Sequence, residues 1–259
     1  MIYVTGDKHG DFTSEEDYQK VERFCKRMGT TKRDVMIVLG DHGVRYYPDS
    51  HRNTKKSMKR LEDMPITWVL IHGNHDRRAN EQNEFKYQCI DDSEKRISGL
   101  FYVNDQYPSV LFPDEYGMYH FGNQYAIIVG GAYSIDKLYR LEQQMYGRKQ
   151  YLWFPDEQLE KWEMTDCSMM FGIMAKDTNT SPFVVLSHTC PMSARPTENL
   201  LQSIDPSIED NTMEQWMESL IQDPAVRKNI SKWYFGHYHT DKNDGMFRAM
   251  YHDIDLLND

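Results

Sequence analysis

The sequence predicts an α/β fold in which strands and helices form separate layers. The clearest sign is the alternation in its first third. There the apolar run Val35–Leu39 is followed by the basic, helix-compatible segment Arg52–Asp63 and then by the apolar run Ile66–Ile71. Continuous apolar runs of this length are typical of strands buried on both faces. Strands that alternate with helical segments favour a layered α/β domain over an all-β one.

The elements that precede this alternation follow from short patterns. Ile2–Thr5 is a β-rich run that ends at a glycine and an aspartate. A helix is expected over Ser14–Met28, because apolar residues recur there at helical spacing. Its first residue is the expected N-cap and Gly29 is the expected stop. Pro65 ends the helix expected at Arg52–Asp63.

The later elements are shorter and less evenly spaced. Strands are expected at Phe101–Val103, Val110–Phe112, Met118–Phe121, Tyr125–Val129, Phe183–Leu186, Trp233–Phe235 and Phe247–Tyr251. Helices are expected at Ile208–Ile221 and at Pro155–Thr165, where Leu159 and Trp162 would face the core. No Gly/Ser/Pro-rich linker marks a boundary. We therefore expect one domain over residues 1–259, with insertions at about 132–181 and 189–229.

Composition narrows the classes of function. Thirty Lys and Arg against forty Asp and Glu leave a formal charge of −10 on 259 residues. This balance argues against broad electrostatic binding of nucleic acid or anionic membrane, although a local site is still compatible with it. No stretch approaches the roughly 20 apolar residues of a membrane span. We expect no membrane association, and an extended nucleic acid is a disfavoured partner.

The N-terminus and the cysteines indicate a cytoplasmic protein. The chain enters its first strand-like run directly and shows no signal-peptide pattern. The four cysteines are dispersed and include no CxxC pair, so reduced thiols are expected rather than a disulfide framework or a structural zinc site.

Metal-capable residues directly follow five of the apolar strands. They are Asp7 and His9, Asp41, Asn74 and His75, His188, and His237 and His239. Open α/β sheets bind ligands beyond the carboxyl ends of their strands, so these side chains converge if the strands share a sheet system. A mixed oxygen and imidazole set suits manganese, iron or zinc better than calcium. Turns also collect Asp and Asn, which accounts for any single position but poorly for the whole set.

The same residues carry a resemblance to a known family. In chain order they stand as Asp7-Lys8-His9, Gly40-Asp41, Gly73-Asn74-His75-Asp76, Ser187-His188 and Gly236-His237-Tyr238-His239. This series resembles the five ordered motifs of the calcineurin-like metallophosphoesterases, namely D-x-H, G-D, G-N-H-[DE], H and G-H-x-H. Each motif alone is weak, but five in order from Asp7 to His239 form a specific pattern. The segments at 130–134 and 187–191 further resemble small bacterial and phage-type members.

The resemblance implies a four-layer αββα sandwich with two divalent metal ions, whose identity as manganese, iron or zinc it leaves open. Asp7, His9 and His239 would hold one ion, Asn74, His188 and His237 would hold the other, and Asp41 would bridge them. A metal-bridging hydroxide would then attack the phosphorus of a phosphate mono- or diester. His75 resembles the catalytic histidine, which stabilises the transition state and protonates the leaving oxygen.

One departure concerns His75. Many members read G-D-x-x-D, where the second Asp orients the catalytic histidine, but here Val44 occupies that position. The sequence therefore does not identify the residue that orients His75, and it assigns no role to His42. Arg45 lies four residues after Asp41, where protein phosphatases place a phosphate-binding arginine, so the resemblance implies a substrate contact for it.

Further substrate contacts are expected in the insertion that begins after Gly130-Gly131. Tyr133, Lys137 and Arg140 follow this strand end and are the first candidates, although packing within the insertion is an equally good explanation. The basic run Arg52–Arg60 is interpreted as a solvated helix face rather than a phosphate-binding patch.

The sequence thus favours a metal-dependent phosphoesterase, a hydrolase whose partner is a phosphate-ester substrate. Phosphatase and phosphodiesterase activities use the same metal core, so the motifs leave the choice between them open. The alternative is a non-catalytic metal-binding scaffold of the same fold. Such a scaffold would be expected to have lost ligands, whereas here every matched position is filled.

Overall fold

A computed structural model of the chain describes residues 1–9, 17–81, 84–148, 152–177, 182–196 and 209–257. The described strands form a 13-stranded sheet. Within the described residues, no helix combines the length and apolar character needed to cross a membrane.

The N-terminal half-sheet holds the first strands of the chain. It consists of β13 (Ile254–Leu256), β1 (Ile2–Thr5), β2 (Val35–Val38), β3 (Thr67–Leu70) and β6 (Val110–Pro113), in that spatial order. Strands β1, β2, β3 and β6 run parallel, and β13 pairs antiparallel with β1. The carboxyl ends of β1, β2 and β3 therefore lie at one edge of the sheet.

The C-terminal half-sheet follows a similar plan. It consists of β7 (Tyr116–Phe121), β8 (Gln124–Val129), β9 (Phe183–Ser187), β10 (Ile230–Phe235), β12 (Phe247–Ala249) and β11 (Lys242–Asp244). Strands β8, β9, β10 and β12 are parallel. β5 (Ile97–Val103) pairs with both β6 and β7 and so joins the two halves, while β4 (Lys86–Asp92) pairs with β5 alone.

Alternation along the strands gives the sheet two buried faces. In β2, Val35 and Ile37 belong to a central apolar cluster that also contains Ile128 of β8 and Leu186 of β9. The two half-sheets therefore pack face to face. Met36, between the two inward residues of β2, points to the opposite side, because successive side chains of a strand alternate between faces.

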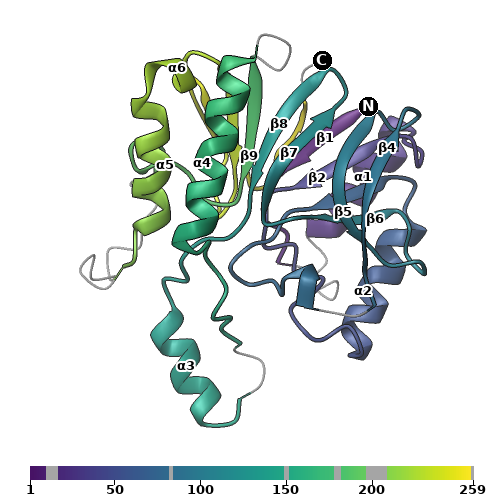
Figure 1. Cartoon of the computed structure of the whole chain (residues 1–259). Helices are drawn as coiled ribbons and strands as arrows, with labels where there is room; N and C mark the ends of the chain where they lie inside the picture. Colours follow the sequence, from purple (N-terminus) through teal and green to yellow (C-terminus); the bar gives the residue numbers. More distant parts are fainter. Residues whose placement is uncertain (10–16, 82–83, 149–151, 178–181, 197–208, 258–259) are drawn as a thin grey trace.

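Two helical layers cover the outer faces. α1 (Asp17–Met28) and α2 (Arg52–Asp63) share an apolar cluster with β1, β2 and β3. α4 (Lys161–Lys176), α5 (Thr212–Gln222) and α6 (Pro224–Arg227) share another with β8, β9 and β10. Figure 1 shows these two helix groups on opposite sides of the strands. The order helix, sheet, sheet, helix is the expected four-layer αββα sandwich.

The remaining helical elements lie in connections. α3 (Lys137–Met145) stands off from both helical layers in Figure 1. Two short 3₁₀ helices, η1 (Ala79–Glu81) and η2 (Met192–Ala194), complete the described elements. The first expected insertion, 132–181, thus divides into the protruding α3 and the layer-forming α4.

Most expected elements are confirmed within a few residues, and Arg52–Asp63 matches α2 at both ends. The helix expected at Pro155–Thr165 is wrong, because α4 begins only at Lys161. Its start is set where the Glu163 carboxylate accepts a hydrogen bond from the backbone N–H of Glu160, at 2.7 Å. Trp162 is consequently 62% exposed instead of facing the core. The expected N-cap Ser14 and the helix start at Ile208 lie outside the described residues.

Candidate metal centre

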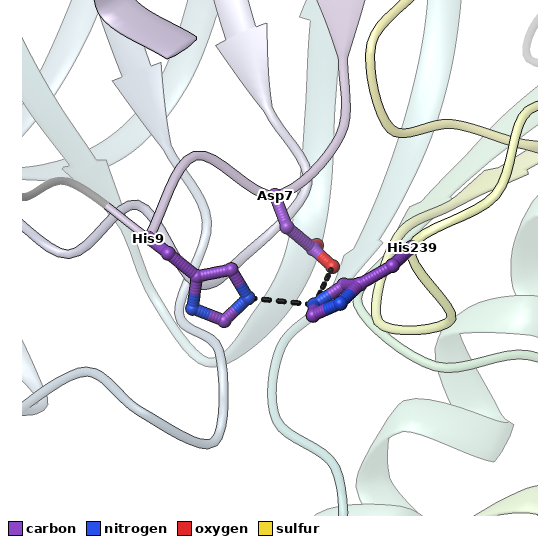
Figure 2. A group of neighbouring side chains, drawn as sticks. All are labelled: Asp7, His9 and His239. Atoms are coloured by element: carbon purple, nitrogen blue, oxygen red, sulfur yellow. Dashed lines mark hydrogen bonds and ion pairs between the residues drawn. The ribbon is translucent and has the colours of Figure 1, made fainter. Parts of the chain in front are cut away.

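Asp7, His9 and His239 form the first group of the site, although His239 lies 230 residues after His9 in the sequence. Asp7 and His9 follow β1, and His239 follows β10. The two Nε2 atoms of His9 and His239 are 2.7 Å apart, and Nε2 of His239 is 3.4 Å from Oδ2 of Asp7 (Figure 2). Three donor atoms of metal-ligand type thus face a common point, each within 4.8 Å of the others.

Asn74 and His188 form a second group, in which the hydrogen bonds show which atoms donate and which accept. Nδ1 of His188 donates to the carbonyl of Leu39 at 2.8 Å. Burial lowers the pKa of His188 to about 4, so the ring is neutral near pH 7 and Nε2 offers a lone pair. That atom lies 2.9 Å from Oδ1 of Asn74, whose amide Nδ2 donates to Oγ of Ser134 at 2.8 Å. Two lone pairs therefore converge, an arrangement that a cation satisfies.

Asp41 lies between the two groups. Its Oδ2 is 3.8 Å from Nε2 of His9, and its Oδ1 is 3.5 Å from Nε2 of His188. His237 completes the set, because its backbone N–H donates to Oδ1 of Asp7 at 2.9 Å and its ring packs edge-on against His188. We call these seven residues the ligand cluster: Asp7, His9, Asp41, Asn74, His188, His237 and His239.

Unusual backbone geometry places several members of the ligand cluster. Among the described non-glycine residues, five have a positive φ, and four of these are His9, Asp41, His237 and His239. Such left-handed conformations cost a non-glycine residue free energy and persist where the surrounding structure enforces them. Their concentration at one place identifies these turns as shaped for a site.

Glycines next to the ligand cluster permit its close packing. At Gly40, φ is +85° and an added Cβ would lie 2.1 Å from Nδ1 of His188. At Gly73, an added Cβ would lie 2.1 Å from the backbone nitrogen of Asp41. Any larger residue at either position would push a candidate ligand out of place.

The electrostatics of the ligand cluster call for positive charge. Asp7 and Asp41 are both buried. Burial, together with the neighbouring Asp41 carboxylate, raises the pKa of Asp7 well above its ordinary value. Oδ2 of Asp7 is buried without a hydrogen-bond partner. Because oxygen and imidazole donors surround these carboxylates, the cluster fits divalent ions such as manganese, iron or zinc.

His75 lies beside the ligand cluster but lacks an orienting carboxylate. Its backbone N–H donates to Oδ1 of Asp41 at 2.8 Å. Its Nδ1 is buried without a hydrogen-bond partner, and Val44 is buried in the apolar cluster under α1 and α2. The adjacent Asp76 does not replace the missing aspartate. It accepts from the backbone N–H groups of His42, Gly43 and Gly73 and so joins two loops.

Arg140 approaches His75 from α3. Its Nη2 is 3.3 Å from Nε2 of His75, and its Nε donates to Asp136 at 2.7–2.8 Å. Nη1 donates to the hydroxyl of Tyr46 at 3.3 Å and to the carbonyl of Leu152 at 3.1 Å. Burial lowers the pKa of His75, and the Arg140 charge acts in the same direction. The structure thus brings Arg140 to the site.

Tyr133 and Arg45 have different surroundings. Tyr133 is half-buried, and the ammonium of Lys137 lies between its ring and that of Trp153, 5.6 Å and 4.4 Å from the two centroids. Arg45 is not brought to the ligand cluster. Its fully buried guanidinium pairs with Asp49 at 3.2 Å and lies over the ring of Phe85. In this structure the Arg45 side chain is therefore occupied by contacts within the protein, and its expected contact with a phosphate stays a prediction.

Sequence reasoning missed Ser134 and Tyr46. Ser134 holds the Asn74 amide, and the Tyr46 hydroxyl contacts Arg140 and accepts from the backbone N–H of Leu152 at 2.6 Å. The segment Gly130–Ser134 carries a signal for Ser134, because its final residue follows a strand end. No sequence pattern distinguishes Tyr46 from its neighbours. His42, whose role was open, accepts from the backbone N–H of Val44 and is a loop residue.

Comparison with known protein families agrees with this arrangement. The family model of the calcineurin-like phosphoesterases matches residues 1–241, which include every residue of the ligand cluster and His75. The chain belongs to the calcineurin-like phosphoesterase family. Members of this family are phosphoesterases that typically bind divalent metal ions.

Solved structures show only distant likeness. A putative 5′-nucleotidase from Staphylococcus aureus, solved with α-ketoglutarate, is 16% identical with a TM-score of 0.47, over 96% of this chain and 48% of that one. A cold-active protein tyrosine phosphatase is 11% identical with a TM-score of 0.31, over 96% of this chain and 68% of that one. The chain thus spans about half the length of the nucleotidase. No curated protein matches the chain.

Proposed function

We propose that the protein is a binuclear metal-dependent phosphoesterase that hydrolyses a phosphate mono- or diester. Asp7, His9 and His239 hold one divalent ion. Asn74, His188 and His237 hold the second. The placement of Asp41 carries this proposal, because its two carboxylate oxygens face histidines of different groups, His9 and His188. A carboxylate in that position can bind both ions at once.

The chemistry divides between the ions and the side chains. When bound, the ions supply the acidity that activates water and the charge that offsets the phosphoryl oxygens. Ser134 fixes the amide of Asn74, so that its oxygen faces His188. His75 borders the same space and acts on the leaving oxygen, while Arg140 contributes positive charge beside it. Tyr133 lies in the loop that carries Ser134, where it contacts the substrate beyond the phosphate.

The test is hydrolysis of a nitrophenyl phosphodiester and its monoester by manganese-loaded protein, with and without a strong chelator. We expect cleavage that chelation abolishes and that a divalent metal restores. Asp41→Asn should lose metal and turnover together, since it removes the shared ligand. Asp91→Asn, an exposed aspartate on β4, is the matched control and should keep both.

The outcomes separate the candidate activities. Cleavage dominated by the diester indicates a phosphodiesterase, and cleavage of the monoester alone indicates a phosphatase. Full turnover in metal-free protein would contradict the proposal. Two bound ions without cleavage of either ester would support the scaffold function instead.

A further inference from the structure

A basic hollow lies on the outer face of the N-terminal half, between α1 and the segment before β13. It has a volume of about 530 Å³ and is lined by Lys20, Arg23, Phe24, Arg27, His252, Asp253 and Ile254. The three cationic residues stand at positions i, i+3 and i+7 of α1, so they share one face over about 10 Å of helix. Arg23 and Arg27 are exposed.

Three neighbouring rings that contact one another connect this hollow with the ligand cluster. The ring of Tyr251 stacks on the ring of His239, with centroids 4.9 Å apart and planes at 15°. The ring of His252 in turn packs against the ring of Tyr251, with centroids 3.9 Å apart. Nζ of Lys20 then lies 3.4 Å from Nδ1 of His252. The hollow therefore begins two rings away from a candidate metal ligand.

Three acidic residues in the described part of the chain near the hollow, Asp253, Asp241 and Glu22, have partners of their own. Asp253 pairs with Arg248 at 2.7 Å. Asp241 accepts hydrogen bonds from the backbone N–H groups of residues 251, 252 and 253, which holds that loop in shape. Glu22 of α1 pairs with Arg60 of α2 at 3.3 Å. Although the net charge of the chain is −10, the residues that line the hollow include three basic side chains, Lys20, Arg23 and Arg27, and one acidic side chain, Asp253.

We propose that Lys20, Arg23, Arg27 and His252, which we call the basic strip, bind a single strand of nucleic acid. The scissile phosphodiester of this strand would lie at the ligand cluster. Arg23 and Arg27, with Lys20, contact successive phosphates, and the exposed ring of His252 stacks on a base. A cationic groove combined with rings that stack on bases is the general solution for single-stranded nucleic acid. This inference rests on the proposed phosphodiester chemistry and gives it a substrate class.

The first experiment measures binding of a fluorescent single-stranded oligodeoxynucleotide of about 12 nucleotides, a length within the range one such groove covers. Fluorescence anisotropy is recorded over a range of salt concentrations. The double variant Arg23→Gln/Arg27→Gln should bind about tenfold or more weakly. The slope of log affinity against log salt concentration should be smaller in magnitude by about 1.4 in this variant, since each lost phosphate contact lowers that magnitude by about 0.7. His252→Ala should weaken binding about tenfold through lost stacking.

Matched controls exclude general charge effects. Lys55→Gln/Lys56→Gln removes the same charge from exposed positions of α2, and His120→Ala removes another histidine packed on a tyrosine, Tyr125. Both controls should bind as the wild type does. An equal loss of affinity for the oligonucleotide in the α1 and α2 variants would overturn the proposal. It would also be overturned if the protein bound a duplex or heparin as tightly as the single strand.

Turnover of the nitrophenyl diester distinguishes the two proposals. All of these variants should cleave this small ester as fast as the wild type does, because it does not reach the strip. Wild-type protein that cuts the small ester but binds no single strand would overturn this inference and leave the proposed function intact. Strand binding that depends on Arg23 and Arg27, in a protein that cuts no ester, would support the strip and contradict the proposed function.

Discussion

Nη2 of Arg140 lies 3.3 Å from Nε2 of His75, and this contact joins the α3 segment to the candidate metal centre. An arginine only donates hydrogen bonds, so Nε2 of His75 accepts and the ring proton resides on Nδ1. That Nδ1 has no partner in the structure, since Val44 stands where many family members carry an orienting aspartate. Arg140 is therefore a charged neighbour of His75 that comes from another part of the chain and has the opposite sign to that aspartate.

Loss of Arg140 should impair hydrolysis without unfolding the protein. Arg140→Gln removes a charge-assisted hydrogen bond worth about 1.5–3 kcal/mol, which corresponds to about 10–100-fold in kcat/KM. The check is steady-state turnover of the nitrophenyl esters across pH. Arg148→Gln, an exposed arginine after α3, is the matched control. Equal effects of the two variants would show that only the net charge of this segment matters.

His75→Ala should separate catalysis from metal binding. His75 adjoins the ligand cluster through a backbone hydrogen bond to Asp41, and substitution of its side chain leaves that bond in place. Turnover should fall on the order of 10²–10⁴-fold while the metal content is unchanged. Metal analysis and single-turnover kinetics on the same preparation measure both quantities. Undiminished turnover would remove His75 from the mechanism.

The crowding at Gly40 can be distinguished from backbone strain. Gly40 and Gly147 both have a positive φ, but an added Cβ meets His188 at the first and nothing within 4 Å at the second. Gly147→Ala should cost about 1–2 kcal/mol of the free energy of unfolding, the penalty for a left-handed residue. Gly40→Ala should cost about 1–3 kcal/mol more and should also lower metal content. Chemical unfolding and metal analysis test this, and equal costs would contradict the packing explanation.

Metal should stabilise the folded chain. Asp7 and Asp41 are buried together, and a bound cation relieves their repulsion. Metal at about 100 times its Kd should add about 2.7 kcal/mol to the free energy of unfolding. Thermal unfolding at increasing manganese concentration measures this effect, and Asp41→Asn should respond much less. An unfolding midpoint that does not change with metal would argue against a structured site.

The buried pair His72 and Glu115 predicts a pH dependence of stability. Their charged atoms are 2.8 Å apart. Although burial opposes charge on both, their attraction raises the pKa of His72 and lowers that of Glu115. The His72 contribution is complete below the ordinary value of 6.5 and is lost as the pH rises through the folded pKa. The Glu115 contribution is present above 4.5 and is lost as the pH falls through its lowered pKa.

Glu115→Gln should therefore be most destabilising between about pH 5 and 6 and less so near pH 8. Urea unfolding of the variant and the wild type at both pH values gives the difference in the free energy of unfolding. A difference that is the same at both would mean that His72 stays neutral throughout this range.

Sequence alone determined the buried apolar strands and the ligand candidates, but not the more exposed strands β4, β11 and β13. Apolar runs such as Val35–Leu39 are local signals, because a strand buried on both faces must be apolar at every position. The motif residues are equally local, since each stands at the end of such a run. The helix expected at Pro155–Thr165 was placed wrongly because its start depends on a hydrogen bond between Glu160 and Glu163 rather than on periodicity.

Only the tertiary structure decided which of these residues meet and what surrounds them. The place of Arg45 in the sequence, four residues after Asp41, predicted a phosphate contact, but the fold buries its side chain against Asp49. The arginine that the fold places beside His75 is Arg140. The basic strip likewise joins α1 to residues near the end of the chain. The physical reason is that a side chain's partners come from packing between distant segments, whereas its tendency to form a strand, helix or turn resides in its immediate neighbours.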